Sequence, residues 1–381
     1  MRRIFLLSAA LASAVAVGFA QTPKYQVEPL WPKPFPVAKH WILGSVSGLA
    51  VDAQDHIWVV HRGVDSLQNN EKGPTLEPWA SECCFPAPQI LEFDAAGTLV
   101  ASWDVGSGKG YDWPHDPAGI AVDSKGNVYV AGGLPPSNLP ARGRGPAPEG
   151  DAAAGRGRGD AAAGRGRGGA PAGPPRAADA QVVKFDKSGK FVSQIGKAGQ
   201  TDASSEANLD RPLGVAIDEG ANELYVADHG HMRIAVFDAN SGAFKRAWQG
   251  NGGDFKVVSC VKIGRDGMVY VCDRENDRIQ VFQKDGKFVK EAAVAKGTGA
   301  DGSVWDLTWT PDQRNVLVAD GQNKKVWILD GKTLAPSGSI GQGGRYPGEF
   351  YAVGSVGVDS KGNVYTGENY EGKRVQKFVK K

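Results

Sequence analysis

A short pattern of apolar runs and turn residues recurs along the chain, and it constrains the fold more than any other feature. Its clearest copy lies in residues 211–237, RPLGVAIDEGANELYVADHGHMRIAVF, where two apolar runs flank the polar turn Asp218–Asn222 and a third run ends at Phe237. Runs of this length, punctuated by Gly, Asp and Asn, are typical of β-strands joined by tight turns. One such unit cannot bury its own faces, so it needs neighbours of the same kind.

Further copies of the pattern supply those neighbours. Their first two strands are expected at 47–52 and 56–60, 117–123 and 127–131, 258–264 and 268–273, 304–310 and 316–320, and 353–359 and 363–366. The later copies recur about every 46 residues, which is the spacing of four-stranded propeller blades. Fourth strands are visible at 191–196, 244–250, 288–294 and 337–341. The sequence therefore predicts an all-β fold, a six-bladed β-propeller.

The shared pattern is P-x-G-[IVL]-A-[VI]-D, a turn, a VYVAD-like strand, and then R-I with a strand that ends in an aromatic residue. This pattern resembles the repeats of NHL propellers, and the resemblance covers nearly the whole chain after residue 20. It implies the six-bladed fold. It does not imply one function, because that fold hosts enzymes, receptors and scaffolds.

The two ends of the chain are expected to meet in the sixth blade. The last copy of the repeat stops at Lys381 with only three strands, and Tyr25–Leu30 (YQVEPL) is a lone strand before a proline-rich segment. Pairing this strand with the last blade removes an exposed sheet edge. We therefore predict that an N-terminal strand closes the ring, and that residues 21–381 form one domain.

The first 20 residues have the pattern of a secretory signal. Arg2 and Arg3 precede an apolar run to Phe19, and small residues allow cleavage after Ala20. An uncleaved anchor is the alternative, but the run is short of a full membrane span. We expect a periplasmic or secreted monomer without a stable membrane span after signal removal. The net charge of +2 gives no reason to expect a nucleic-acid partner.

Residues 134–179 differ in composition from the rest of the chain. They consist mainly of Ala, Gly, Pro and Arg, with GRGRGDAAAGRGRGG at the centre, and they interrupt blade two between its second and third strands. A segment with so few large apolar residues cannot form a core of its own. We expect a disordered insert.

The chain has four cysteines, which allow three pairings. Cys260 and Cys272 fall on neighbouring strands of one predicted hairpin and nearly face each other, so a disulfide is expected there. Cys83 and Cys84 would then form a bond between adjacent residues. The alternative is reduced, buried thiols.

The residue just after each second strand differs from blade to blade. These residues are Arg62, Gly133, His229, Arg274, Gly321 and Asn369. A residue that serves the fold should be similar in every blade, so this ring is the predicted ligand site. By contrast, Asp228 with Arg233 and Asp273 with Arg278 recur at matching offsets, which indicates structural ion pairs.

Histidines and aromatic residues add to the candidate site. His61, His115, His229 and His231 all map to the face that carries the ring, either as a metal or acid–base cluster or as ordinary polar loop residues. Tyr351 lies in a loop before blade six and could wall a pocket there. We predict Arg62, His229 and Arg274 as catalytic candidates, and His61, His115, His231, Asn369 and Tyr351 as ligand-binding candidates.

Among NHL enzymes the chain most resembles peptidyl-α-hydroxyglycine α-amidating lyase. The resemblance lies in HRG at 61–63, LYVAD at 224–228 and DREN at 273–276, and it implies that Arg62 and Arg274 take the positions of that family's arginines. It does not extend to zinc, because the positions of the zinc histidines hold Ala118, Ser259 and Gly354. A weaker resemblance to lactonase-like propellers rests on Glu368 with Asn369 and implies calcium as the alternative cation.

These observations lead to a first hypothesis and two alternatives. A guanidinium group presents a fork of donors that fits a carboxylate, so we expect an exported propeller that binds a small anionic molecule or peptide on this face. The first alternative is a divergent lyase-like enzyme that uses Arg62, Arg274 and a histidine of blade three. The second alternative is a platform for protein interactions.

Overall fold

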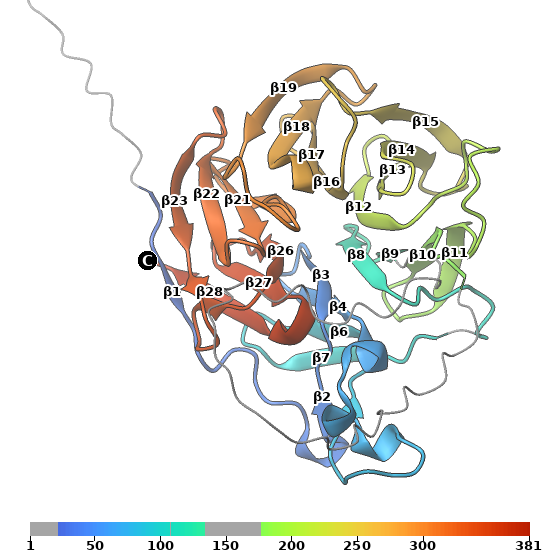
Figure 1. The fold of residues 1–381 in the computed structure, drawn as a ribbon, viewed down its shortest axis with the longest axis vertical. Helices are drawn as coiled ribbons and strands as arrows, with labels where there is room; N and C mark the ends of the chain where they lie inside the picture. Colours follow the sequence, from blue (N-terminus) through green and yellow to red (C-terminus); the bar gives the residue numbers. More distant parts are fainter. Residues whose placement is uncertain (1–21, 107, 134–176) are drawn as a thin grey trace, which may run out of the picture.

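The six-bladed propeller is confirmed by a computed structural model, which describes residues 22–106, 108–133 and 177–381. Within these residues, six four-stranded antiparallel sheets surround one axis as the blades of a disc (Figure 1). The innermost strand of each blade lines the axis, and the chain then passes outward through the blade. The repeat seen in the sequence is therefore one blade.

The strand bounds follow the repeat from blade to blade. Blade one contains β3 (Val46–Val51), β4 (Ile57–His61), β6 (Ile90–Phe93) and β7 (Leu99–Trp103). Blade two contains β8 (Pro117–Val122), β9 (Val128–Gly132), β10 (Gln181–Phe185) and β11 (Phe191–Gly196). Blade three contains β12 (Pro212–Asp218), β13 (Glu223–Asp228), β14 (Arg233–Asp238) and β15 (Phe244–Gln249).

The second half of the disc continues in the same order. Blade four contains β16 (Val258–Ile263), β17 (Val269–Asp273), β18 (Arg278–Phe282) and β19 (Phe288–Ala293). Blade five contains β20 (Asp306–Trp309), β21 (Asn315–Asp320), β22 (Lys325–Asp330) and β23 (Pro336–Ile340). Blade six contains β26 (Val353–Val358), β27 (Val364–Glu368), β28 (Val375–Lys380) and β1 (Tyr25–Val27).

The N-terminal strand closes the ring as the sequence predicts. β1 is antiparallel to β28, with Tyr25 opposite Lys380 and Val27 opposite Phe378. Trp31 then turns into the core, where its ring centroid lies 4.9 Å from that of Tyr365. The first described strand and the last strand thus share one blade, and no edge of β28 is left exposed.

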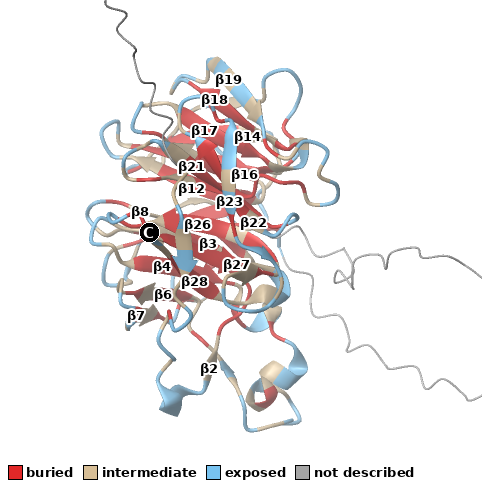
Figure 2. Ribbon diagram, turned by 90° about the vertical axis from the view of Figure 1, so that its left-hand side faces the viewer, coloured by how far each residue is buried: buried red, intermediate tan, exposed pale blue. Residues whose placement is uncertain are grey.

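The core lies between the blades. Buried residues lie mostly on the inner strands, while exposed residues gather on the loops and on the outer strands (Figure 2). On the inner strands the repeat glycines allow close packing: a Cβ on Gly119 would lie 2.6 Å from the carbonyl oxygen of Leu213, and one on Gly214 would lie 2.9 Å from Cα of Cys260. The glycine of the P-x-G pattern is therefore required by the close approach of backbones at the axis.

Short elements decorate the loops of the face that carries the second-strand ends. In blade one, β2 (Trp41–Ile42) pairs in parallel with β5 (Phe85–Pro86). β24 (Gln342–Gly343) pairs with β25 (Glu349–Phe350) before blade six. The 3-10 turns are η1 (Val37–Lys39), η2 (Gly63–Ser66), η3 (Asn69–Glu71), η4 (Gly73–Thr75), η5 (Arg274–Asn276) and η6 (Tyr370–Gly372).

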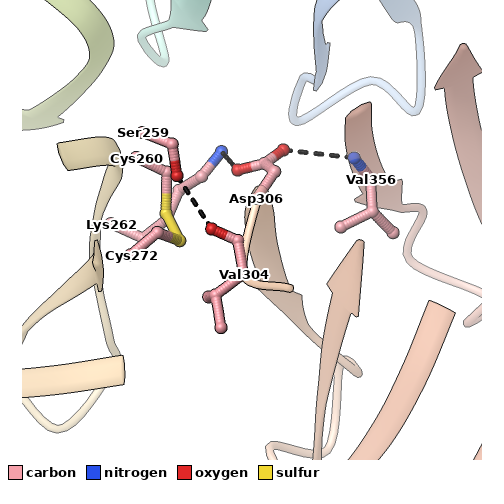
Figure 3. The surroundings of a disulfide bond; sticks show 7 residues. All are labelled: Ser259, Cys260, Lys262, Cys272, Val304, Asp306 and Val356. Atoms are coloured by element: carbon pink, nitrogen blue, oxygen red, sulfur yellow. Dashed lines mark hydrogen bonds and ion pairs between the residues drawn. A yellow bond between two sulfur atoms is a disulfide. The ribbon is translucent and has the colours of Figure 1, made fainter. Parts of the chain in front are cut away.

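Both expected cysteine pairs are joined in the structure. Cys260 on β16 lies opposite Cys272 on β17, and their sulfur atoms form a disulfide beside the axis (Figure 3). Cys83 and Cys84 form a disulfide between adjacent residues in the long blade-one loop. The alternative of reduced thiols does not fit this arrangement.

Two of the predicted segments fall largely outside the described residues. These are the signal at 1–20 and most of the insert at 134–179. The predicted insert boundary is wrong at its C-terminal end, because Asp179 is fully buried and accepts hydrogen bonds from the backbone of blade two. The part of the chain that the structure describes contains no helix with the length and apolar character needed to cross a bilayer.

Candidate functional site

The loop leading into a blade is held by a side chain at the end of that blade's second strand. In blade two this side chain comes from a residue that lies next to the strand end. Asp228 accepts a hydrogen bond from the backbone nitrogen of Asp210 (2.8 Å), and Asp273 accepts one from Lys256 (3.0 Å). Glu368 accepts from the nitrogen of Tyr351 (2.6 Å). We call the residues with this role the clamp residues, and in the described part of the chain they are His61, Asp179, Asp228, Asp273 and Glu368.

His61 is a clamp residue and not a ligand-binding residue, which corrects the sequence-based expectation. Its Nδ1 accepts from the backbone nitrogens of Gly44 (3.2 Å) and Gly63 (3.1 Å), and its Nε2 donates to the carbonyl oxygen of Pro88 (2.9 Å). The side chain is fully buried, and burial lowers the pKa of His61 to about 4. Both ring nitrogens are thus used by the fold, so the imidazole takes the place that a carboxylate has in other blades.

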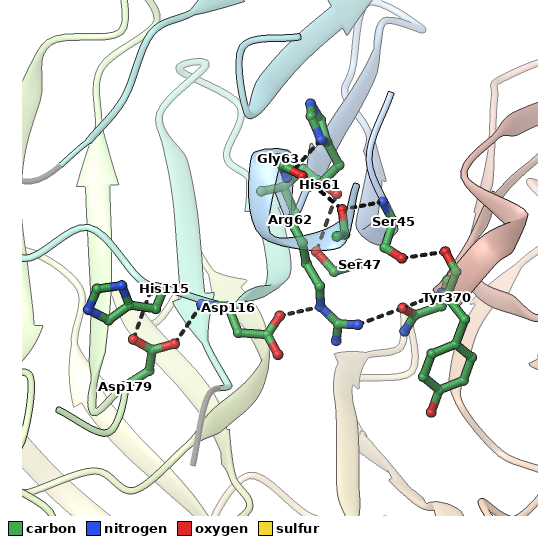
Figure 4. Close-up of polar contacts among 12 residues, drawn as sticks. Ser45, Ser47, His61, Arg62, Gly63, His115, Asp116, Asp179 and Tyr370 are labelled. Atoms are coloured by element: carbon green, nitrogen blue, oxygen red, sulfur yellow. Dashed lines mark hydrogen bonds and ion pairs between the residues drawn. The ribbon is translucent and has the colours of Figure 1, made fainter. Parts of the chain in front are cut away.

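Asp179 is the clamp residue of blade two. The second strand β9 ends in Gly132, which has no side chain to accept a hydrogen bond. A Cβ at Gly132 would lie 2.8 Å from Cβ of Asp179, so Asp179 occupies the missing side chain's place. Its carboxylate accepts from the backbone nitrogens of His115 and Asp116, both at 2.9 Å (Figure 4).

The predicted ring begins with Arg62, which directly follows β4. Its Nε donates to the carboxylate of Asp116 in blade two, and its Nη1 donates to Oδ1 of Asn369 in blade six (2.8 Å). Figure 4 shows the guanidinium group between Asp116 and the loop that carries Tyr370. The structure therefore brings Arg62 and Asn369 together, and Arg62 spans three blades at the face of the disc.

Arg274 lies near Tyr370 and packs against Trp305. Its guanidinium carbon is 4.6 Å from the ring centroid of Trp305, which is a cation–π distance. Tyr370 packs edge-on against the same tryptophan, with 6.0 Å between the ring centroids, and its hydroxyl donates to Asp301 (2.8 Å). Burial and the carboxylate of Asp301 raise the pKa of Tyr370, while the charges of Arg274 and Arg62 act in the opposite direction. Both arginines therefore lie close enough to Tyr370 for their charges to lower its pKa.

His229 completes the cluster from blade three. Burial and the positive charges of Arg211 and Arg274 lower its pKa to about 4, so the imidazole is neutral at pH 7. Its Nδ1 is buried and has no hydrogen-bond partner among the described residues. The three residues predicted as catalytic thus gather at one face: Arg274 lies close to His229, and Tyr370 links Arg274 to Arg62.

The other predicted ligand-binding residues have different positions. The Nδ1 of His231 bonds Asp228 (2.8 Å) and its Nε2 bonds the carbonyl oxygen of Thr201 (3.0 Å), so this histidine supports the clamp. Its pKa is raised by the hydrogen bond to Asp228. The side chain of Tyr351 bonds Glu371, and the guanidinium carbon of Arg345 lies 4.6 Å from its ring centroid. His115 lines a groove with Arg62, and this groove is described below.

Some residues of the cluster were not identified from the sequence. Arg211 was assigned to the repeat, although the residue before the repeat proline differs between blades as strongly as the predicted ring does. That position holds Ser45, Asp116, Arg211, Val257, Ser303 and Ala352. Comparing this position between blades also identifies Asp116. Comparing the x position of P-x-G between blades identifies Trp305.

The axial channel below this cluster is narrow, with a volume of about 40 Å³. This volume holds a few water molecules at most. Lys262 and Asp306 form an ion pair inside it (3.0 Å), where the carboxylate also accepts from the backbone nitrogen of Val356 (Figure 3). A ligand larger than water therefore does not fit inside the channel, which Leu213 and Trp305 also line.

The donors expected for calcium do not form an open cation site. The carboxylate of Glu368 accepts from Arg374, from Gln376 (3.1 Å) and from the backbone of Tyr351. Oδ1 of Asn369 accepts from Arg62 and from the nitrogen of Tyr370 (2.8 Å). These oxygens already serve donors of the protein, so the Glu–Asn pair does not fit calcium.

Another group of potential ligands among the described residues also has a structural explanation. Asp52, His56 and Glu92 bring donor atoms within 4.8 Å of one another. Asp52 accepts from two backbone nitrogens and from Nε1 of Trp58 (2.9 Å), and His56 bonds Glu92 (2.5 Å). Asp123 and Asp359 make the same turn in other blades, where their partners are tyrosines. The carboxylate at this position is a turn former.

Comparison with known proteins agrees with the fold. The model of the family described as NHL repeat matches residues 209–237, and that of Beta-propeller repeat matches residues 110–132. The chain is 28% identical to NHL repeat-containing protein 3 of Mus musculus over 184 residues, which is 42% of this chain and 46% of that protein. The Homo sapiens protein of the same name is 27% identical over 179 residues, with the same coverage. The chain thus spans less than half the length of these curated relatives.

A solved structure supports the same architecture. A structural genomics protein of unknown function from Bacteroides thetaiotaomicron superposes with a TM-score of 0.52 and 14% identity, over 89% of this chain and 70% of that chain. A likeness at this identity concerns the fold alone. The chain is therefore a six-bladed β-propeller with NHL repeats, and its activity has to be argued from the site.

Proposed function

We propose that this propeller is exported and binds a small anionic ligand, such as a peptide carboxylate, at the mouth of its axial channel. The observation that carries the proposal is a cluster of arginines at this face, where Arg211 and Arg274 lie near the neutral His229, and Arg274 and Arg62 lie near Tyr370. The pKa of His229 is lowered mainly by burial and in part by two of these arginines, while Asp210 and Asp228 act in the opposite direction. The donor fork of a guanidinium group fits a carboxylate, and the neutral imidazole adds no charge that would repel it.

The surroundings of Arg274 favour binding of a flat anionic group. The guanidinium lies over the Trp305 ring, which fixes its plane and orients its fork. Trp305 itself is almost fully buried and donates from Nε1 to the carbonyl oxygen of Gly302 (2.9 Å). Because the platform is held by the fold, little side-chain entropy is lost when a carboxylate binds.

The proposal is tested by calorimetric titration with N-acetylglycine and with its amide, which lacks the charge. We expect the acid to bind and the amide to bind at least about tenfold more weakly, because a charge-assisted hydrogen bond contributes about 1.5–3 kcal/mol. Arg274→Ala should remove the preference for the acid. Arg265→Ala is the matched control, since Arg265 is exposed on the opposite, hairpin-turn side of blade four. Equal binding of acid and amide would refute the proposal.

A lyase-like reaction is the second candidate, and His229 is the observation in its favour. Its buried Nδ1 without a partner among the described residues is placed as a general base would be. The low pKa of His229, about 4, makes the imidazole a weak base, and this favours binding over proton abstraction. The test is whether the protein releases an amide product from a peptidyl-α-hydroxyglycine. Release by the wild type and its loss in His229→Ala would support the enzyme.

A further inference from the structure

A groove opens between blades one and two on the same face as the arginine cluster. Its volume is about 610 Å³, which is in the range of small-molecule sites. The walls come from the loops before and after the strands of blade one and from the loop leading into blade two. Its apolar walls are Trp41, Val64, Phe85 and Trp113, and its titratable members are Arg62, Asp65, Asp104 and His115.

The walls of the groove are held in place by the fold. Trp113 is buried and donates from Nε1 to Oε1 of Gln89 (2.8 Å). Phe85 belongs to β5, which is fixed by its parallel pairing with Trp41 and Ile42 of β2. Even so, Phe85 is 44% exposed and Val64 is 42% exposed. Apolar side chains that are rigidly held and yet open to solvent mark binding surfaces.

Arg62 connects this groove to the channel mouth. It lines the groove, and its Nη1 donates to Asn369 in blade six on the axial side. A ligand whose carboxylate lies on the arginine cluster therefore has its neighbouring atoms next to the groove. The positive charge of Arg62 at this end and the apolar walls beyond it match a molecule with one anionic end and an apolar body.

We infer that the ligand is an amphipathic carboxylate, with its anionic group on the arginine cluster and a large apolar side chain in the groove between blades one and two. The occupant that fits these features is the C-terminal residue of a peptide when that residue is aromatic or a branched aliphatic. This inference rests on the proposed carboxylate site. It adds a specificity pocket that the repeat pattern does not encode, since it is built from the long loop particular to blade one.

The test compares N-acetylphenylalanine, N-acetylglycine and N-acetylphenylalanine amide by calorimetry on the mature protein. We expect N-acetylphenylalanine to bind about tenfold more tightly than N-acetylglycine, because its apolar ring is transferred from water into the groove. Phe85→Ala should remove most of this difference and leave N-acetylglycine unaffected. Trp79→Ala is the matched control, because Trp79 is 61% exposed in the same loop and does not line the groove.

The outcomes separate the inference from the proposal on which it rests. If both acids bind equally, and binding of both is lost in Arg274→Ala, then the carboxylate site stands and the groove is not its pocket. If the amide binds as well as N-acetylphenylalanine and Arg274→Ala changes neither, the carboxylate site itself is wrong. A loss of the phenylalanine preference in Trp79→Ala but not in Phe85→Ala would also overturn the inference. Thermal unfolding of each variant shows whether it is folded.

Discussion

Two consecutive positions at the end of each second strand differ in what they do. The first position, or Asp179 in its place, carries the clamp residues, which are buried and bind the backbone of their own blade. The second position carries Arg62, His229, Arg274 and Asn369, which contact other blades or face the channel mouth. One step along the chain thus separates residues that hold a blade together from residues that can meet a ligand.

The difference follows from strand geometry. Successive side chains of a strand point in opposite directions, so adjacent residues at a strand end face different surroundings. The clamp side chain meets the same loop in blades one, two, three, four and six, where it holds the loop that leads into the blade. Its identity can change if the acceptor is kept, as His61 shows. The next side chain has no such common partner, and its identity is free to follow function.

The largest effect on stability is expected when a clamp loses its charge partner. Asp273 is fully buried and pairs with Nε of Arg278 (2.7 Å), so Arg278→Ala leaves a buried carboxylate without its cation. We expect the free energy of unfolding to fall by about 3 kcal/mol. Urea denaturation measures this change. Asp273 would still accept hydrogen bonds from Asn276 and Lys256. The expected loss of stability is therefore at the low end of the range for breaking a buried ion pair.

The control for this prediction is an exposed ion pair. Arg314 and Asp312 lie 3.9 Å apart, with side chains 73% and 43% exposed. Arg314→Ala should change the free energy of unfolding by less than about 0.5 kcal/mol. Similar losses in both variants would mean that the clamp adds no more than a surface pair, and the comparison between the two positions would fail.

A smaller effect is expected from the clamp histidine as the pH falls. The folded-state pKa of His61 is about 4 and its ordinary value is 6.5, so the unfolded state binds the proton more tightly. Stability from neutral His61 is therefore complete above about pH 6.5 and is lost as the pH falls toward 4. We expect a loss of about 2 kcal/mol between pH 7 and pH 5 from this residue.

The measurement is the pH dependence of unfolding in the wild type and in His61→Asn. Asparagine keeps an acceptor for the nitrogens of Gly44 and Gly63 but does not titrate. The variant should lose less stability between pH 7 and pH 5 than the wild type. The pKa of His229 is also lowered in the folded protein. Because His229 is present in both the wild type and the variant, it does not affect the difference between their pH profiles. Identical pH profiles would show that His61 is not protected from protons in the fold.

The sequence allowed the fold to be predicted and the site only in part. The number of repeat copies predicts the blade number, and the unpaired third strand at the C-terminus predicts the closure by β1. The ring of variable residues predicted that Arg62, His229 and Arg274 lie on one face of the disc. His61 was misassigned because one blade cannot reveal that an imidazole replaces a carboxylate. Asp179 was hidden because the insert separates it from Gly132, the strand end whose role it takes.

The smallest effect on stability is expected at the variable position itself. The side chains of Arg62 and Asp116 are 26% and 20% exposed, so water can replace part of their interaction. We expect Arg62→Ala to lower the free energy of unfolding by about 1 kcal/mol, which urea denaturation can resolve from the loss in Arg278→Ala. A loss as large as that in Arg278→Ala would mean that Arg62 holds blades one, two and six together. In that case Arg62 would have a structural role, and Arg274 would bind the ligand without its help.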